Sequence, residues 1–295
     1  MKKSDVPVII PVSIFWKIFS LIYRLIPKQR FKELFETIVS IFLLEKKIYF
    51  KEINTGICFT LKFGDEFTRK IILNKAYEPY SVKLAMQLMT SHRGTFVDIG
   101  ANFGLYSCLV SSIPNVKTIA IEPHHEVFSS LIKNVKRNKL SNVDCYLGCV
   151  SSETKVVLFA EPNRRNSGIG QVVNSTINKE CFFTGQFNIS HVLKTMGCDN
   201  IQLMKIDIEC GEITLLRQIF LDGEFIPKHI IIEFNKIGSL DATSLFNLLT
   251  EYGYRAHTVN GHPITQTPTS MPYECNLWFS LGDERLCKSL TLASP

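Results

Sequence analysis

From about residue 95 onward, the apolar residues of the chain follow two alternating spacings. Short continuous apolar runs, typical of buried strands, are separated by segments in which apolar residues recur every three or four positions, typical of helices. This β-α-β alternation predicts an α/β fold with a parallel sheet and helices on both of its faces. The predicted strands are Thr95–Val97, Thr118–Glu122, Val143–Val150, Lys155–Ala160, Gln202–Ile208 and His229–Phe234, and the predicted helices cover about 105–112, 126–138, 189–196 and 212–220.

The C-terminal part of the pattern predicts a helix at about 241–252, followed by two closing strands, Arg255–Val259 and Asn276–Leu281. The long connection between these strands contains Gly261 and several prolines. We therefore expect it to be an exposed loop, of the kind that often closes over a ligand. A second polar loop is predicted at Glu161–Gly170.

Residues 6–26 are strongly apolar, but a membrane span does not fit them well. Pro7 and Pro11 interrupt the run, and Lys17 would lie near the bilayer centre at a cost of roughly 2.5–3.5 kcal/mol. Polar residues recur at helical spacing instead, which predicts an amphipathic helix that ends at Pro27.

A second amphipathic helix is predicted at about Phe31–Leu44, and the two helices form a predicted N-terminal extension, residues 1–46. The main domain is predicted to cover 47–295. It begins between Lys47 and Leu73 with two short strands around the turn Asn54-Thr55-Gly56, and a helix at Tyr80–Thr90 follows.

The net charge of +6 is confined to the N-terminus, because residues 1–51 hold ten Lys or Arg against four Asp or Glu, whereas the remaining residues hold 23 of each sign. A neutral main body without a basic stripe argues against nucleic-acid binding. The wide apolar faces of the two N-terminal helices need a partner surface. That surface is either protein, in this domain or in a homodimer, or an anionic membrane that the helices contact peripherally.

Hydrophobic residues make up 45% of the chain and charged residues 20%, a balance typical of a folded globular protein. Nine cysteines are scattered along the chain without a Cys-x-x-Cys pair. This usage argues against a disulfide framework and a zinc site and favours a reducing compartment. We therefore expect a cytoplasmic protein, peripheral to the inner membrane if the N-terminal helices bind lipid.

The stretch Val97–Gly104, with the sequence Val-Asp-Ile-Gly-Ala-Asn-Phe-Gly, joins a predicted strand to a predicted helix. This spacing suits an adenosine-containing cofactor, because Gly100 permits a sharp turn and Gly104 lets a ligand approach the helix start. The glycine patterns of pyrophosphate-binding and P-loop proteins are absent. S-adenosylmethionine has no phosphate and carries a sulfonium and an amine, so an acid such as Asp98 is favourable near it. An ordinary glycine-containing turn is the alternative.

Ligands bind at the carboxyl ends of parallel strands, and several polar residues are expected there. Glu122 is placed to accept hydrogen bonds from the ribose hydroxyls of an adenosine. Methylation of a hydroxyl also needs a proton acceptor, for which Asp207, Glu209 and Glu233 are candidates. A metal shared by these acids is less favoured, since such sites need more than neighbouring acids. The strand-end residues are Asp98, Glu122, Cys149, Asp207 with Glu209, and Glu233 with Asn235.

Ordered motifs between Tyr77 and Leu281 resemble the FkbM-type methyltransferases, which depend on S-adenosylmethionine. The resemblance implies a Rossmann-like, seven-stranded methyltransferase sheet, mostly parallel with an antiparallel C-terminal hairpin. It also implies cofactor contacts at Glu78, Asp98, Gly100, Asn102 and Glu122. The motifs are Tyr77-Glu78-Pro79, Phe96–Gly104, Ile121-Glu122-Pro123, Asn166-Ser167-Gly168, Met204–Glu209 and Ile231-Ile232-Glu233.

Two positions depart from the family pattern. Cys210-Gly211 stand where the family usually has Gly-Ala, and Cys149 stands where many methyltransferases place an acid for the adenine amino group. We nevertheless expect Cys149 to lie beside the cofactor, because it ends a predicted strand.

The sequence therefore predicts an S-adenosylmethionine-dependent methyltransferase that acts on a hydroxyl of a sugar, glycan or other natural product. N-methylation of an amide or amine in a modified peptide is an alternative within the same class. A cofactor-binding scaffold without catalysis is an alternative from another class. In each catalytic case the acceptor is a small molecule, glycan or peptide.

Overall fold

The computed structural model of the chain describes residues 7–25, 47–62, 66–160, 170–173, 181–208, 211–234, 240–268 and 276–282. The helix predicted at Phe31–Leu44, nearly all of the loop Glu161–Gly170 and the candidate residue Glu209 lie outside these ranges.

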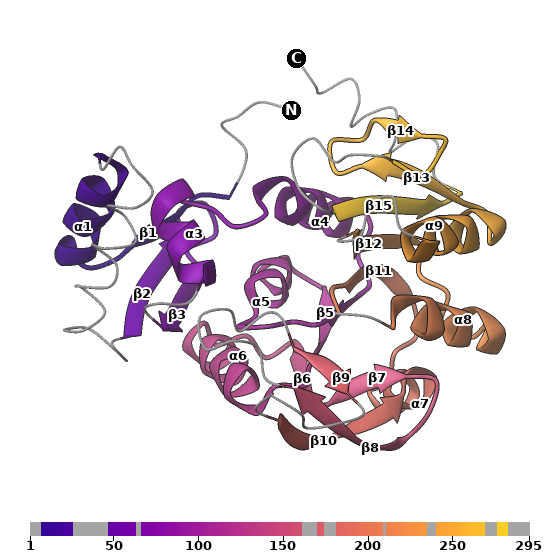
Figure 1. Cartoon of the computed structure of the whole chain (residues 1–295). Coiled ribbons are helices and arrows are strands. Elements are labelled where there is room, and N and C mark those ends of the chain that lie inside the picture. Colours follow the sequence, from indigo (N-terminus) through magenta and orange to yellow (C-terminus); the bar gives the residue numbers. More distant parts are fainter. Residues whose placement is uncertain are drawn as a thin grey trace.

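A large central sheet forms the middle of the described structure (Figure 1). Its strand order is β14-β13-β15-β12-β11-β4-β5-β6. The pairs from β12 to β6 are parallel, whereas β15 is antiparallel to both of its neighbours. The bounds are β4 (Thr95–Ile99), β5 (Lys117–Glu122), β6 (Val143–Leu147), β11 (Ile201–Ile206), β12 (His229–Glu233), β13 (Tyr254–Thr258), β14 (Pro263–Ile264) and β15 (Asn276–Leu281).

The prediction of a mostly parallel seven-stranded sheet with an antiparallel C-terminal hairpin is thus confirmed. The short edge strand β14 is an addition, and it lies in the connection that we expected to be entirely loop. It pairs with β13 through His257 and Ala256, so part of the predicted loop is fixed at the sheet edge.

Helices cover both faces of the sheet, and each face has its own hydrophobic core. Successive residues of a strand point to opposite faces: Phe96 packs into one core and Val97 into the other. Strand β11 is buried at every position, as expected for a parallel strand with helices on both sides. The first core contains α4 (Pro79–Ser91), α5 (Leu105–Ser111) and α6 (His125–Arg137), and the second contains α7 (Ile189–Thr195), α8 (Glu212–Asp222) and α9 (Leu240–Glu251).

A small N-terminal sheet, β1-β2-β3, lies beside this body together with α1 and α3 (Figure 1). The predicted strand pair around Asn54-Thr55-Gly56 is confirmed, but its second half is not a strand throughout: Glu66–Asn74 is the helix α3, whose buried Ile71 and Ile72 face the core. The bounds are β1 (Ile9–Pro11), α1 (Ile14–Leu25), β2 (Lys47–Glu52) and β3 (Cys58–Lys62). None of the helices in the described residues has both the length and the apolar character that crossing a membrane requires.

Two asparagines, one in α6 and one directly after it, attach this small sheet to the main body. Asn134 and Asn138 accept hydrogen bonds of 2.8 Å each from the backbone nitrogens of Thr60 and Cys58. The Asn134 amide also donates to the carbonyl oxygen of Phe103, at 2.9 Å. The N-terminal sheet is therefore bonded, through one side chain, to the loop between β4 and α5.

A second, four-stranded sheet, β7-β10-β8-β9, was only partly predicted. The strand expected at Val143–Val150 is interrupted at Gly148, whose φ is 153°, and β7 begins at the next residue. The strands β9 and β10 were not predicted. A side chain at Gly148 would meet the Phe187 ring at 2.7 Å, so the break depends on glycine. The bounds are β7 (Cys149–Ser151), β8 (Lys155–Ala160), β9 (Gln171–Val173) and β10 (Cys181–Asn188).

Gly104, which precedes α5, has a packing role that can be measured. Its φ is 88°, and a Cβ there would lie 2.6 Å from Cδ1 of Leu131 in α6. Gly104→Ala should lower the free energy of unfolding by about 1–2 kcal/mol for the left-handed backbone, plus the cost of displacing Leu131. Gly223→Ala, with φ 68° and open space around it, is the control for the backbone effect alone. Equal losses in urea unfolding of the two variants would contradict the packing role.

Candidate active site

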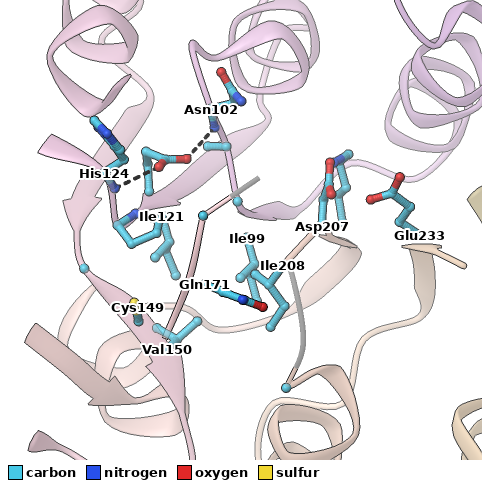
Figure 2. Close-up of a pocket in the computed structure, with 18 of the residues that line it drawn as sticks. Ile99, Asn102, Ile121, His124, Cys149, Val150, Gln171, Asp207, Ile208 and Glu233 are labelled. Carbon is cyan, nitrogen blue, oxygen red and sulfur yellow. Dashed lines mark hydrogen bonds and ion pairs between the residues drawn. The ribbon is translucent and has the colours of Figure 1, made fainter. Parts of the chain in front are cut away.

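A cavity of about 740 Å³ opens at the carboxyl ends of β4, β5, β11 and β12. Parallel α/β sheets bind ligands at this edge, and the volume suits a molecule of nucleoside size or larger. Residues from the second sheet, including Cys149 and Gln171, close one side (Figure 2). The predicted site residues Glu78, Gly100, Asn102, Glu122, Cys149, Asp207 and Glu233 all line this one cavity.

Glu122, the last residue of β5, places a buried carboxylate at one end of the cavity. Its Oε2 accepts a hydrogen bond from the backbone nitrogen of Asn102 and its Oε1 accepts one from that of His124, both at 2.9 Å (Figure 2). Burial raises the pKa of Glu122 to about 7, although these two hydrogen bonds favour the ionised form. Each carboxylate oxygen can accept a further hydrogen bond from a ligand.

The loop after β4 is held close to the neighbouring strand ends. The backbone nitrogens of Gly100 and Ala101 donate to the carbonyl oxygen of Ile121 at 3.0 and 2.9 Å. Gly100 has φ 78°, and a Cβ there would lie 1.9 Å from the carbonyl oxygen of Asp207. The expected sharp turn at Gly100 is confirmed, and it also lets the loop approach the end of β11. Asn102 is left-handed too, with φ 52°, which is uncommon for a residue with a side chain.

Aliphatic side chains surround the part of the cavity next to Glu122. Ile99, Ile121, Val150 and Ile208 line it, as Figure 2 shows. Cys149 lies beside Val150, and burial together with the charge of Glu122 raises the pKa of its thiol to about 12, so the thiol is neutral. This part of the cavity therefore offers apolar walls to a flat ring, with an acid at its edge.

Two carboxyl groups, Asp207 and Glu233, face each other at the opposite end of the cavity (Figure 2). Burial and the charge of Asp207 raise the pKa of Glu233 to about 9. Burial also disfavours the ionised form of Asp207, but Lys205 and a hydrogen bond with Glu233 outweigh it and keep the pKa of Asp207 below its usual range. At neutral pH the pair therefore holds one proton, and it resides on Glu233.

Lys205 fixes the position of Asp207. Its Nζ lies 2.7 Å from Oδ2 of Asp207 and 4.8 Å from the centre of the Tyr106 ring. Burial disfavours the ammonium, but the charges of Asp207, Glu78 and Asp98 outweigh it and raise the pKa of Lys205. This buried lysine is thus paired with an acid.

Glu78 completes this end of the cavity. It precedes α4 with a left-handed φ of 42°, and its Oε2 accepts a 2.6 Å hydrogen bond from the hydroxyl of Tyr106. Burial and the nearby acids raise the pKa of Tyr77. Left-handed backbone at a residue with a side chain is energetically costly and is concentrated at functional sites, and Glu78 and Asn102 both line this cavity.

Asp98 and Gly104 are not among the residues that line the cavity. Asp98 is 1% exposed, accepts a 2.5 Å hydrogen bond from the Ser107 hydroxyl, and has its pKa raised by burial. Its role as a cofactor contact stays a prediction, as does the role of Glu209. Sequence reasoning gave no role to Tyr106 or Gln171, because neither belongs to a motif or ends a strand of the central sheet.

The residues present fit S-adenosylmethionine. Glu122 could accept hydrogen bonds from its ribose hydroxyls, and the aliphatic walls suit its adenine ring. At the other end, Glu78 and the ionised Asp207 would lie near its cationic groups. Among the described residues, no group of three or more His, Cys, Asp or Glu is arranged to hold a metal ion.

Residues 62–242 match the family defined by the Vibrio cholerae RfbT protein, which is more than half of the chain. The chain belongs to the RfbT family. No curated protein matches the chain. The match does not identify the FkbM membership implied by the motifs.

Several solved methyltransferase structures are similar to this RfbT-family chain, at low identity. The O-methyltransferase TomG from Streptomyces achromogenes, solved with S-adenosylmethionine, is 12% identical with a TM-score of 0.44, covering 83% of this chain and 94% of its own. TYW2 from M. jannaschii is 13% identical with a TM-score of 0.40, covering 80% and 87%. Precorrin-6y C5,15-methyltransferase from Geobacter metallireducens is 12% identical with a TM-score of 0.38, covering 69% and 87%. These similarities are too distant to transfer an activity.

Proposed function

We propose that this chain is an S-adenosylmethionine-dependent methyltransferase that methylates a hydroxyl group on a sugar, glycan or other natural product. The observation that most supports this function is the distribution of acidic side chains between the two ends of one cavity. Glu122 stands at its apolar end, and the pair Asp207–Glu233 stands at the other. The motifs shared with FkbM-type methyltransferases point to the same cofactor and acceptor class, and we propose FkbM membership on that basis.

Glu122, Asn102 and the aliphatic walls would hold the nucleoside part of the cofactor, and Glu78 its amine. When bound, S-adenosylmethionine supplies a methyl group on a sulfonium cation. The ionised Asp207 favours a cation nearby, because opposite charges within a few ångströms attract strongly in a buried site. A pyrophosphate would instead be repelled by these acids.

Asp207 is the proton acceptor that the geometry favours. A hydroxyl that gains a methyl group must lose its proton, and at neutral pH Asp207 is ionised whereas Glu233 is protonated. If the hydroxyl oxygen took the methyl group from the sulfonium, its proton would pass to Asp207. Lys205 and the protonated Glu233 hold the Asp207 carboxylate in place throughout.

Transfer of a labelled methyl group from S-adenosylmethionine to a panel of acceptors tests this function. The panel contains mono- and oligosaccharides with free hydroxyls, and peptides with free amides and amines. Labelled methyl ethers are the expected product. Labelling of nitrogen alone would favour N-methylation of a peptide. Binding of the cofactor without any transfer would favour a non-catalytic scaffold.

We also propose that α1 contacts the surface of an anionic membrane, which would place a cytoplasmic protein at the inner membrane. Ile14, Ile18, Leu21, Ile22 and Leu25 are 45–73% exposed and recur at helical spacing. The whole net charge of the chain lies in residues 1–51, which suits anionic lipid better than a second, equally charged copy. In Figure 1, α1 lies at the edge of the molecule, away from the central sheet.

Vesicle sedimentation tests this contact. The double variant Ile18→Glu and Leu21→Glu should bind vesicles containing phosphatidylglycerol at least about tenfold less than the natural chain does. Val156→Glu, at a 73% exposed position on β8, is the matched control and should bind normally. Equal binding by all three proteins would contradict the proposal. The proposal would also be contradicted if the natural chain does not bind vesicles and forms a dimer that dissociates in the double variant.

A further inference from the structure

A glutamine side chain lies among the aliphatic walls at the Glu122 end of the cavity. Gln171 belongs to β9, which is held against β8 by the pair Ala160 and Gln171. Figure 2 shows its carboxamide between Ile99, Ile208 and Val150, pointing into the cavity. Gln171 is half-buried, and a ligand that fills the cavity would cover its carboxamide. The covered carboxamide would then need a hydrogen-bond partner, because burying it without one costs free energy.

Three other polar side chains that line the cavity have a hydrogen-bond partner or are weak acceptors. The Gln186 amide donates to the carbonyl oxygen of Glu153 at 3.3 Å. Nδ1 of His124 accepts from the backbone nitrogen of Glu126 at 3.2 Å. The neutral thiol of Cys149 is a weak donor and acceptor. Within the described residues, no hydrogen bond to the Gln171 carboxamide is found, so this group is available to a ligand.

We propose that Gln171 is the residue that selects adenine, by accepting a hydrogen bond from the 6-amino group. This inference rests on the proposed function, and it assigns the nucleobase contact that the motifs left open at Cys149. A carboxamide offers an acceptor and a donor side by side, which matches the amino group of adenine and the ring nitrogen next to it. The second sheet thus provides nucleobase specificity, while the central sheet provides the ribose contact at Glu122.

A thermodynamic cycle on ligand binding tests this contact without requiring turnover. The two ligands are S-adenosylhomocysteine and its analogue that lacks the 6-amino group, and the two proteins are the natural chain and Gln171→Leu. The natural chain should bind the analogue about tenfold more weakly, the size of one hydrogen bond. Gln171→Leu should bind both ligands with equal affinity. Gln171→Glu, which keeps an acceptor at the same distance, should restore the preference for the amino group.

Gln186→Leu is the matched control, because it removes a carboxamide of the same sheet that already has a partner. The ratio of its affinities for the two ligands should equal that of the natural chain. If Gln186→Leu binds both ligands equally, or if Gln171→Leu keeps the affinity ratio of the natural chain, the role of Gln171 is wrong. Either result would leave the methyltransferase proposal intact. Failure of the natural chain to bind S-adenosylhomocysteine at all would overturn both.

Discussion

Asp207→Asn should lower kcat for methyl transfer by about a thousandfold, whereas Glu233→Gln should keep kcat within about tenfold of the natural value. Asp207 is the ionised member of the pair, so the asparagine removes the only proton acceptor of the two. Glu233 is protonated at neutral pH and serves as a hydrogen-bond donor to Asp207, a task that the amide of glutamine also performs. Initial-rate kinetics at saturating cofactor measure the contrast.

Measurements of melting temperature and ligand affinity test whether a lower kcat is caused by loss of folding. Melting temperature and the affinity for S-adenosylhomocysteine should change little in Glu233→Gln, and the affinity should fall less than kcat in Asp207→Asn. If Glu233→Gln loses as much activity as Asp207→Asn, the proton acceptor is Glu233 and the assignment of roles is wrong. Lys205→Met should resemble Asp207→Asn, because Asp207 loses the ammonium that keeps it ionised.

Glu122→Gln should weaken binding of S-adenosylmethionine by roughly a hundredfold, since hydrogen bonds to a charged group contribute about 1.5–3 kcal/mol. One carboxylate oxygen becomes an NH2 group, which cannot accept from a ribose hydroxyl and faces a backbone N–H of Asn102 or His124. Glu153→Gln, at an exposed acid paired with Lys155, is the control and should leave the affinity unchanged.

The pH dependence of the same affinity gives an independent check on Glu122. Its pKa of about 7 in the free protein means that binding to the carboxylate requires loss of a proton at lower pH. The part of the affinity that depends on Glu122 should level off above its pKa and fall by up to about tenfold per pH unit well below it. Glu122→Gln should lack this component. An identical slope in the variant would show that another group titrates.

The central sheet was predictable because its strands are buried on both faces and therefore have continuous apolar runs, as in β11 and β12. The helix α3 was missed because its short apolar segment follows two strands and resembles a third. The strands β9 and β10 were missed because their positions alternate weakly between buried and exposed. Their pairing depends on partners distant in the sequence, which local patterns do not specify.

At the site, the strand-end rule brought Glu122, Asp207 and Glu233 to one cavity correctly. The rule does not say which strand-end residues line the cavity, and Asp98, which accepts a hydrogen bond from Ser107, is not among them. The position of the proton in the Asp207–Glu233 pair depends on burial and on Lys205, which only the folded chain reveals. Gln171 comes from the second sheet, where no motif marks it.

Calorimetric titration of the full chain with S-adenosylmethionine measures cofactor binding, on which the proposed methyltransferase function depends. We expect saturable binding of one ligand per chain with a Kd below about 1 mM, in the range where enzymes commonly bind their substrates. The heat of binding should saturate in the natural chain. In Glu122→Gln, half-saturation should require a much higher ligand concentration. If the folded chain does not bind S-adenosylmethionine at millimolar concentration, the cavity is not a site for this cofactor and the proposed function is wrong.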